Sequence, residues 1–306
     1  MRAEFHELAE KVNNWGRWGA DDERGTLNFV TPEVVRAAAG CVRSGRSFAL
    51  AIPLSADGPQ IGMIPGRINP LKTMLAINDP MTGNIDEFCT SDDTVVMGLQ
   101  AGTHWDSLAH ATYSNRIYND APIESLTAHG AGRCGIDKLG AVVSRGVLLD
   151  VARAKGLDRL EPGYALNAAD LDAAAEFGNV TVRSGDIVLV RTGQMQLLVA
   201  GDKMGYTVPS PGFSMQTALW LHDHEVAAVA NDTIVFEVFP GEYDDLPLPV
   251  HLLHLVEMGL TQGQNWNLEE LAADCAEDGQ YDFLLTATPE PFVAGLGAPV
   301  APVAVK

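Results

Sequence analysis

The chain has 306 residues, of which 46% are hydrophobic and 20% charged, and its formal net charge is −20. This composition excludes a disordered chain and is typical of a globular protein with a sizeable core. The acidic balance excludes nucleic acid and anionic membrane surfaces as partners, because phosphate binding needs a cationic surface. No apolar run is long enough to span a bilayer. We expect a single domain over residues 1–306, with the segment of about residues 1–45 packed on it as an extension.

The first clear element in chain order is a helix that begins at Pro32, with Thr31 as its N-cap and proline in its first turn. The stretch 58–78 is rich in glycine, proline and methionine without clear periodicity, so we expect a long loop of the kind that often covers enzyme sites. The apolar run 95–99 is expected to be a strand that continues into the polar segment after it.

Beyond this segment, apolar runs and amphipathic stretches alternate. We expect strands over 142–143, 146–151, 185–191 and 226–230, and helices over 170–176, 212–224, 251–258 and from 267 onward. Asn167 is the expected N-cap of the first of these helices. The continuous apolar runs indicate strands that are buried on both faces. Strands that end in polar residues, with helices between them, indicate a mixed α/β or α+β protein.

The most informative segment runs from Gln100 to His110 and holds two histidines, a carboxylate and an amide. Along a continuous strand Gln100, His104 and Asp106 would lie on one face, and Gly102 between them would leave room for an ion or a substrate. Imidazole and carboxylate together suit a divalent transition metal such as zinc or manganese. A His-x-Asp pair alone, however, is more often a hydrogen-bonded or solvated pair.

The longer pattern Gly102-Thr103-His104-x-Asp106-x-x-x-His110 resembles the signature of the metal-dependent cyclase family, which includes bacterial kynurenine formamidase and isatin hydrolase. That signature reads His-x-Gly-Thr-His-x-Asp-x-x-x-His, and Gln100 replaces its first histidine. A second family element, histidine followed about a dozen residues later by Glu-Asn, corresponds to His251 and Gln264-Asn265, with glutamine in place of glutamate. Segments 14–16 and 22–28 are similar to the opening of larger family members.

This resemblance implies a swivelling β/β/α cyclase-like fold and a homodimer or homotetramer. It implies that Gln100, His104 and Asp106 surround one metal ion, and that Asp106, His251 and Gln264 surround a second. Because amide oxygen is a poorer ligand than imidazole or carboxylate, we expect one ion, Mn²⁺ or Zn²⁺, and not a full two-zinc site. A pocket without metal is the alternative.

Four further residues carry expectations besides the ligand set. His110 is the candidate catalytic acid or base, because imidazole titrates near neutral pH, and the resemblance implies the same role. Trp105 is expected to contact an aromatic substrate. Asp232 follows a predicted strand and is expected either to orient a ligand histidine or to cap a turn. For His254, one helical turn after His251, we expect a surface or packing role.

Together these residues favour a metal-dependent hydrolase that opens a cyclic amide, lactone or N-acyl bond of a small aromatic metabolite by metal-activated water. A ring-closing cyclase or dehydratase would use the same residues. Gln100 and Gln264 leave a third hypothesis, a non-catalytic ligand-binding protein with a degraded metal site. Four scattered cysteines and the start Met1-Arg2-Ala3-Glu4, which has no secretory pattern, predict reduced thiols in a cytoplasmic protein.

Overall fold

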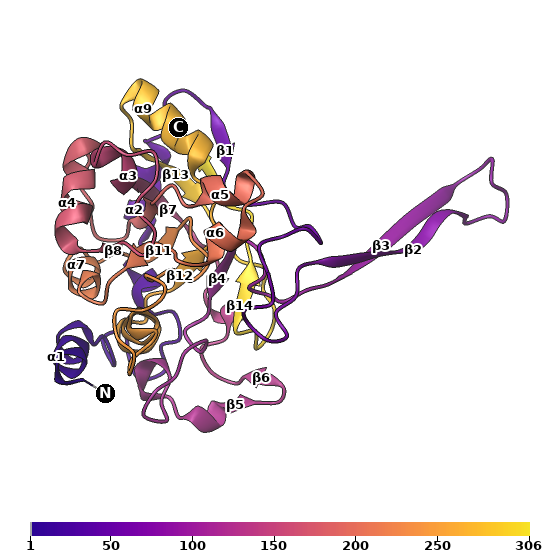
Figure 1. Cartoon of the computed structure of the whole chain (residues 1–306). Helices are drawn as coiled ribbons and strands as arrows, with labels where there is room; N and C mark the ends of the chain where they lie inside the picture. The colour runs from indigo at the N-terminus through magenta and orange to yellow at the C-terminus, as the bar shows by residue number, and fades with distance from the viewer. Residues whose placement is uncertain (1) are drawn as a thin grey trace.

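A single mixed sheet organises the chain. The computed structural model describes residues 2–306, and within them nine strands form this sheet (Figure 1). Their order is β1 (Ser47–Ala49), β15 (Val303–Val305), β13 (Asp282–Thr286), β7 (Val143–Asp150), β9 (Ile187–Arg191), β11 (Ala228–Asn231), β12 (Gln262–Gln264), β4 (His104–Asp106) and β14 (Gly297–Pro299). Strands β7, β9, β11 and β12 run parallel, and the outer strands join antiparallel on both sides. The predicted mixed α/β fold is confirmed.

Helices pack on both faces of this sheet. The longer ones are α1 (Ala3–Val12), α2 (Pro32–Ala39), α4 (Ala168–Phe177), α7 (Thr217–Asp223) and α9 (Glu269–Asp278). Alternate side chains of β9 enter two cores: Val188 and Val190 join one with α1, α4 and α7, whereas Ile187 and Leu189 join the other with α9. The central strands are therefore buried on both faces, as their continuous apolar runs predict. No helix within residues 2–306 has the length and hydropathy that a bilayer crossing requires.

Shorter elements complete the fold around this sheet. They are helices α3 (Val151–Ala154), α5 (Met195–Val199), α6 (Lys203–Thr207) and α8 (Pro249–His251), and the strand pairs β5 (Leu126–Thr127) with β6 (Gly130–Ala131) and β8 (Ala165–Leu166) with β10 (Gly212–Phe213). A π-helix, η5 (Leu252–Met258), continues directly from α8. π-Helical turns are rare in proteins, and those that occur often lie near functional sites.

Two predicted helix starts are confirmed and one predicted helix is shorter than expected. The Thr31 hydroxyl caps α2 by accepting from the Val34 N–H at 3.3 Å. Asn167 and Asp170 form a reciprocal capping box at the start of α4. The helix expected over 212–224 covers only Thr217–Asp223, because its first residues pair with β8 as strand β10.

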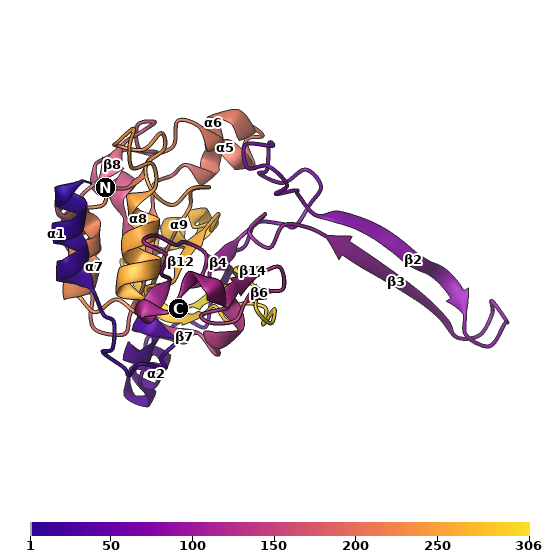
Figure 2. The ribbon, with the colours of Figure 1, turned by 90° about the horizontal axis from the view of Figure 1, so that it is seen from below.

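The expected loop over 58–78 is wrong from Leu71 onward. Strand β2 (Leu71–Pro80) pairs with β3 (Cys89–Val96) in a long antiparallel hairpin, here called the arm, which projects from the body of the protein (Figures 1 and 2). Leu75 and Ile77, on one face of β2, are 68% and 74% exposed. Because the arm packs neither face on this chain, its sequence carries no hydrophobic alternation, and alternation is the signal by which strands are recognised.

The expected strand from Val95 through Asp106 is also wrong. Strand β3 ends at Val96, and the chain turns: the Gly98 N–H donates to the Ile68 carbonyl at 3.2 Å, and the Ala101 N–H donates to the Gly98 carbonyl at 3.0 Å. A new strand, β4, begins only at His104. His104 and Asp106 therefore share a strand, whereas Gln100 lies in the turn before it.

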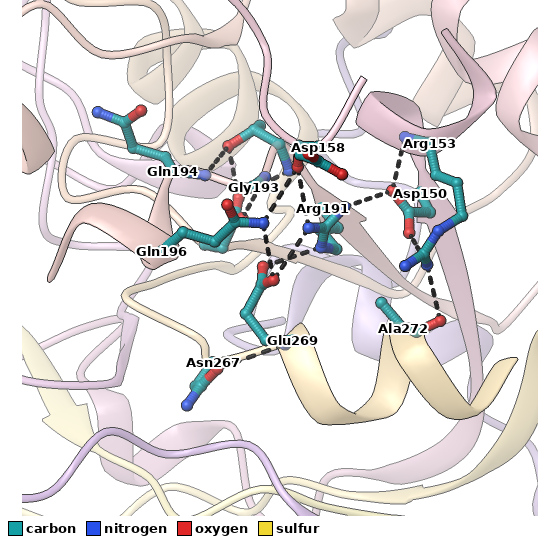
Figure 3. A network of polar contacts seen from close by, with 12 residues as sticks. Asp150, Arg153, Asp158, Arg191, Gly193, Gln194, Gln196, Asn267, Glu269 and Ala272 are labelled. Atoms are coloured by element: carbon teal, nitrogen blue, oxygen red, sulfur yellow. Dashed lines mark hydrogen bonds and ion pairs between the residues drawn. The ribbon is translucent and has the colours of Figure 1, made fainter. Parts of the chain in front are cut away.

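A buried ionic network ties α9 to the carboxyl ends of β7 and β9 (Figure 3). Arg191 forms a bidentate pair with Glu269 at 2.8 and 2.9 Å, and also donates to Asp150 at 2.9 Å. Arg153 holds the other oxygen of Asp150 at 2.8 Å. Such a network fixes the end of the sheet because every charge in it has a partner.

Candidate metal centre

The candidate centre lies at the edge of the sheet where strands β11 and β12 end. Strand β4 pairs antiparallel with β12, and the register places His104 opposite Gln264. Ligand sites in open α/β sheets commonly lie at the carboxyl ends of parallel strands. The pairing therefore joins two polar segments that are far apart in the sequence.

His104 and Asp106 form the buried floor of this centre. The Nε2 atom of His104 lies 3.5 Å from Oδ1 of Asp106. The Nδ1–H of His104 donates to the Gly102 carbonyl at 2.8 Å, so Nε2 keeps a free lone pair. Among residues 2–306, neither this Nε2 nor this Oδ1 has a hydrogen-bond partner, although both are buried. Burying a polar atom without a partner destabilises the fold unless a bound ligand interacts with that atom.

Two more histidines face the same carboxylate. Asp106, His110 and His251 each offer one ligand atom, and these atoms lie within 4.8 Å of one another. His110 Nε2 is 3.8 Å from Asp106 Oδ1. Behind His251, Glu237 accepts the Nδ1–H at 2.5 Å, which leaves His251 Nε2 free for a ligand. A carboxylate behind a ligand histidine is a common feature of metal sites.

The second oxygen of Asp106 is held by the two glutamines of β12. Gln264 Nε2 donates to Asp106 Oδ2 at 2.7 Å, and Gln262 Nε2 lies 3.4 Å from the same atom. The two amides share a face of β12 because side chains alternate along a strand. Gln264 thus contacts Asp106 as a hydrogen-bond donor and also lines the adjoining cavity.

The electrostatics keep Asp106 ionised and His110 neutral. Burial would raise the pKa of Asp106, but its electrostatic interactions with His110, His104 and His251 outweigh burial and hold this pKa well below its ordinary value. Asp106 favours protonated His110, but burial and the charges of His251 and Arg67 prevail and lower the pKa of His110. Burial opposes protonation of His251, but the hydrogen bond to Glu237 prevails and raises its pKa.

A cavity of about 270 Å³ opens in front of the centre. Its polar wall consists of Arg67, His110, His251 and Gln264, together with Thr112, and its apolar wall consists of Ile64, Ala111, Ile234, Val235, Leu248 and Leu252. The volume suits a small molecule, and a mostly apolar wall with a few convergent polar groups is typical of ligand sites.

The structure brings together five of the seven predicted site residues: His104, Asp106, His110, His251 and Gln264. Gln100 lies in the turn before β4, with its amide against Gly297 of β14, the residue that pairs with Asp106; a Cβ atom on Gly297 would come within 2.7 Å of Gln100 Nε2. Trp105 is fully buried, packs edge to face on Trp266 and donates to the Ala287 carbonyl. It does not line the cavity, so we withdraw it as a substrate contact.

Sequence reasoning missed Glu237, Gln262 and Arg67. Gln262 could have been found, because it lies two residues before Gln264 on the same strand and therefore shares its face. Nothing in the sequence around Glu237 or Arg67 distinguishes them from solvated charges, since tertiary packing alone places them. Asp232 caps a turn by accepting from Thr192 and Gly193. His254 is buried in a packing position, with its Nδ1 at 3.2 Å from Gln262 Oε1.

The donor set fits a divalent metal ion. Asp106, His110 and His251 offer ligand atoms within 4.8 Å of one another, and His104 Nε2 lies 3.5 Å from Asp106 Oδ1. Within the described part of the chain, neither His104 Nε2 nor Asp106 Oδ1 has a hydrogen bond that would compete with a metal. Nitrogen and carboxylate ligands of this kind suit zinc or manganese. The orphaned atoms of His104 and Asp106 are the observation on which this assignment rests.

Comparison with known proteins agrees with this geometry. The model of the Cyclase family, described as "Putative cyclase", matches residues 26–238. A crystal structure described as a novel cyclase is 36% identical, with a TM-score of 0.87, and the match covers 96% of this chain and 100% of that one. No curated protein matches the chain.

Two more distant structures share the fold. Isatin hydrolase A from Labrenzia aggregata, bound to benzyl benzoate, is 20% identical with a TM-score of 0.63, over 87% of this chain and 94% of that one. A predicted metal-dependent hydrolase from Bacillus stearothermophilus is 14% identical with a TM-score of 0.52, over 85% and 97%. The expected cyclase-like fold is thereby confirmed. Because the family model covers more than half of the sequence, the chain belongs to the Cyclase family.

Proposed function

We propose that this protein is a metal-dependent hydrolase that opens a cyclic amide, a lactone or an N-acyl bond of a small aromatic molecule. The observation that carries the proposal is the pair of buried, unpartnered ligand atoms, His104 Nε2 and Asp106 Oδ1, beside a cavity with an apolar wall. The fold shared with an isatin hydrolase supports the reaction class, because isatin contains a cyclic amide. Benzyl benzoate, the ligand of that neighbour, is an aromatic ester.

The proposed ion is a single Mn²⁺ or Zn²⁺ held by His104, Asp106 and His251. When bound, a divalent ion of this kind lowers the pKa of water and polarises a carbonyl group. Gln264 and Gln262 orient the carboxylate of Asp106, and Glu237 fixes His251 with its Nδ1 protonated. The protein side chains thus set the direction and charge of every ligand atom.

His110 is the proposed general base. Its imidazole lines the cavity, its side chain is 24% exposed, and its lowered pKa leaves it neutral and able to take a proton from water. Its position next to Asp106 also makes it a potential ligand, and the two roles predict different outcomes. A base leaves metal binding intact when it is removed, whereas a ligand does not.

The activity test uses isatin and phthalide, a cyclic amide and a lactone, with Mn²⁺- or Zn²⁺-loaded protein. We expect hydrolysis that His104→Ala abolishes together with metal binding, whereas His110→Ala keeps the metal and slows turnover about 10²- to 10⁴-fold. His129→Ala, at an exposed position, is the matched control. Loss of metal from His110→Ala would reassign His110 as a ligand. Rates of all variants near the wild-type rate would refute the proposal.

We also propose that copies of this chain assemble into a homodimer or homotetramer through the arm. A two-stranded hairpin is marginally stable alone in water, and this one exposes Phe88 and Val96 by 64% and 62%. A second copy of the chain that docks on the arm would bury these exposed apolar side chains. Light scattering after size-exclusion chromatography should show an oligomer, and shortening the arm should give monomers. A monomeric wild-type protein would contradict this assembly.

A further inference from the structure

Arg67 is a cationic residue on the cavity wall that the proposed reaction does not use. It lies just before the arm, and its backbone N–H donates to the Ile64 carbonyl at 3.2 Å. Its side-chain stem packs over Gly98, where a Cβ atom would come within 3.1 Å of Arg67 Cγ. The turn that interrupts the strand before β4 therefore also positions Arg67.

The guanidinium of Arg67 has no partner of its own. Among the described residues 2–306, no side chain or carbonyl forms a hydrogen bond or ion pair with it. The other two titratable residues on the cavity wall do have partners: His110 contacts Asp106, and His251 contacts Glu237. Asp106 is the acid whose charge acts on Arg67, and both oxygens of Asp106 already face His104, His110 and the glutamines. A half-buried cation without a partner is favourable where a ligand supplies the counter-charge.

The local charge balance supports an anionic ligand. Asp106 and Glu237 contribute two negative charges around the centre, whereas a divalent ion and Arg67 together would contribute three positive charges. Burial lowers the pKa of Arg67 and the charge of Asp106 opposes this, yet a guanidinium stays protonated in proteins. The remaining wall is largely apolar, so the charged part of a ligand would face Arg67 and the histidines.

We propose that Arg67 binds a carboxylate group of the ligand, so that the site takes small molecules with an apolar body and one carboxylate. The planar guanidinium matches a carboxylate with two parallel hydrogen bonds. A cavity of about 270 Å³ admits a ligand of one or two rings. The inference rests on the proposed function for its substrate class, but the binding of the anion can be tested without catalysis.

The test measures binding of benzoate and of its neutral isostere benzamide by calorimetry, with metal-free and Mn²⁺-loaded protein. In the metal-free protein we expect wild type to prefer benzoate, and Arg67→Met to lose about 10- to 100-fold in benzoate affinity with little change for benzamide. Arg67→Lys should retain part of this affinity, because it keeps the charge but not the planar fork. Arg36→Met, an exposed arginine on α2, is the matched control.

Unchanged benzoate affinity in Arg67→Met, or equal binding of benzoate and benzamide to wild type, would overturn the proposal. These outcomes are independent of catalysis: a protein that binds benzoate through Arg67 but hydrolyses nothing would refute only the proposed function. Circular dichroism and melting temperature check that each variant is folded.

The carboxylate has two sources, the substrate itself or the acid that hydrolysis releases. If hydrolysis forms the carboxylate in the site, Arg67→Met weakens inhibition by the acid released from phthalide and leaves the KM for phthalide unchanged. With a carboxylated phthalide, the same substitution raises KM if the substrate brings the carboxylate. No effect of the substitution on either substrate or product would contradict a role for Arg67 in the reaction.

Discussion

Replacing Glu237 with glutamine should weaken metal binding about 10- to 100-fold, the range found when the partner of a ligand histidine is changed. Glu237 is 2% exposed and accepts three hydrogen bonds, from the N–H groups of Val250 and His251 and from His251 Nδ1. Glutamine offers one acceptor oxygen, so its amide N–H₂ group must face one of these donors. If it faces Nδ1, the favoured tautomer of His251 carries its proton on Nε2, the atom that the metal needs.

The expected loss corresponds to about 1.4–2.7 kcal/mol of binding free energy. Competition with a chromophoric chelator measures it, at a pH where the wild type is saturated. Glu225→Gln, which alters a carboxylate in a surface ion pair with Arg17, is the control and should bind metal as wild type does. An unchanged affinity in a folded Glu237→Gln variant would refute the proposed role of Glu237 in metal binding through His251.

Two further predictions concern stability. Replacing Arg191 with methionine leaves Asp150 buried and partly unpaired, and should cost about 3–5 kcal/mol in denaturant unfolding, whereas a cost below about 1 kcal/mol would show that the network of Figure 3 is dispensable. Burial lowers the pKa of His254 to about 3, so below pH 6.5 the unfolded chain binds a proton that the folded chain does not, and the stability of the fold decreases as the pH falls toward 3. Between pH 7 and pH 5 the metal-free wild type should therefore lose about 2 kcal/mol more than His254→Gln, and parallel pH profiles of the two proteins would contradict a neutral, buried His254.

Local signals in the sequence predict the elements that obey local rules. The caps at Thr31 and Asn167 depend on a few neighbouring residues, and the apolar runs of β7 and β9 record burial on both faces. The arm carries no such pattern, because, over residues 2–306, neither of its faces packs on the body of the protein. Its strand β2 therefore appears as part of a loop in the sequence.

In the candidate centre, too, the local sequence predicts some residues, whereas others come to the site only through tertiary packing. The spacing of His104 and Asp106 on one strand is local, and the structure places both at the floor of the centre. Gln100 does not share this strand, because the chain turns at Gly98 and Ala101 before β4 begins. Glu237 and Arg67 come to the site through the packing of distant segments, and no period or spacing in the sequence records such a contact.

The most direct test of the account is the metal content of the protein by elemental analysis, after purification without chelator and after dialysis against Mn²⁺ or Zn²⁺. We predict about one retained ion per chain in the wild type and in His129→Ala, and none in His104→Ala or Asp106→Ala. A folded wild type that retains no ion under any loading condition, or variants that retain as much as wild type, would contradict a metal centre built on His104 and Asp106.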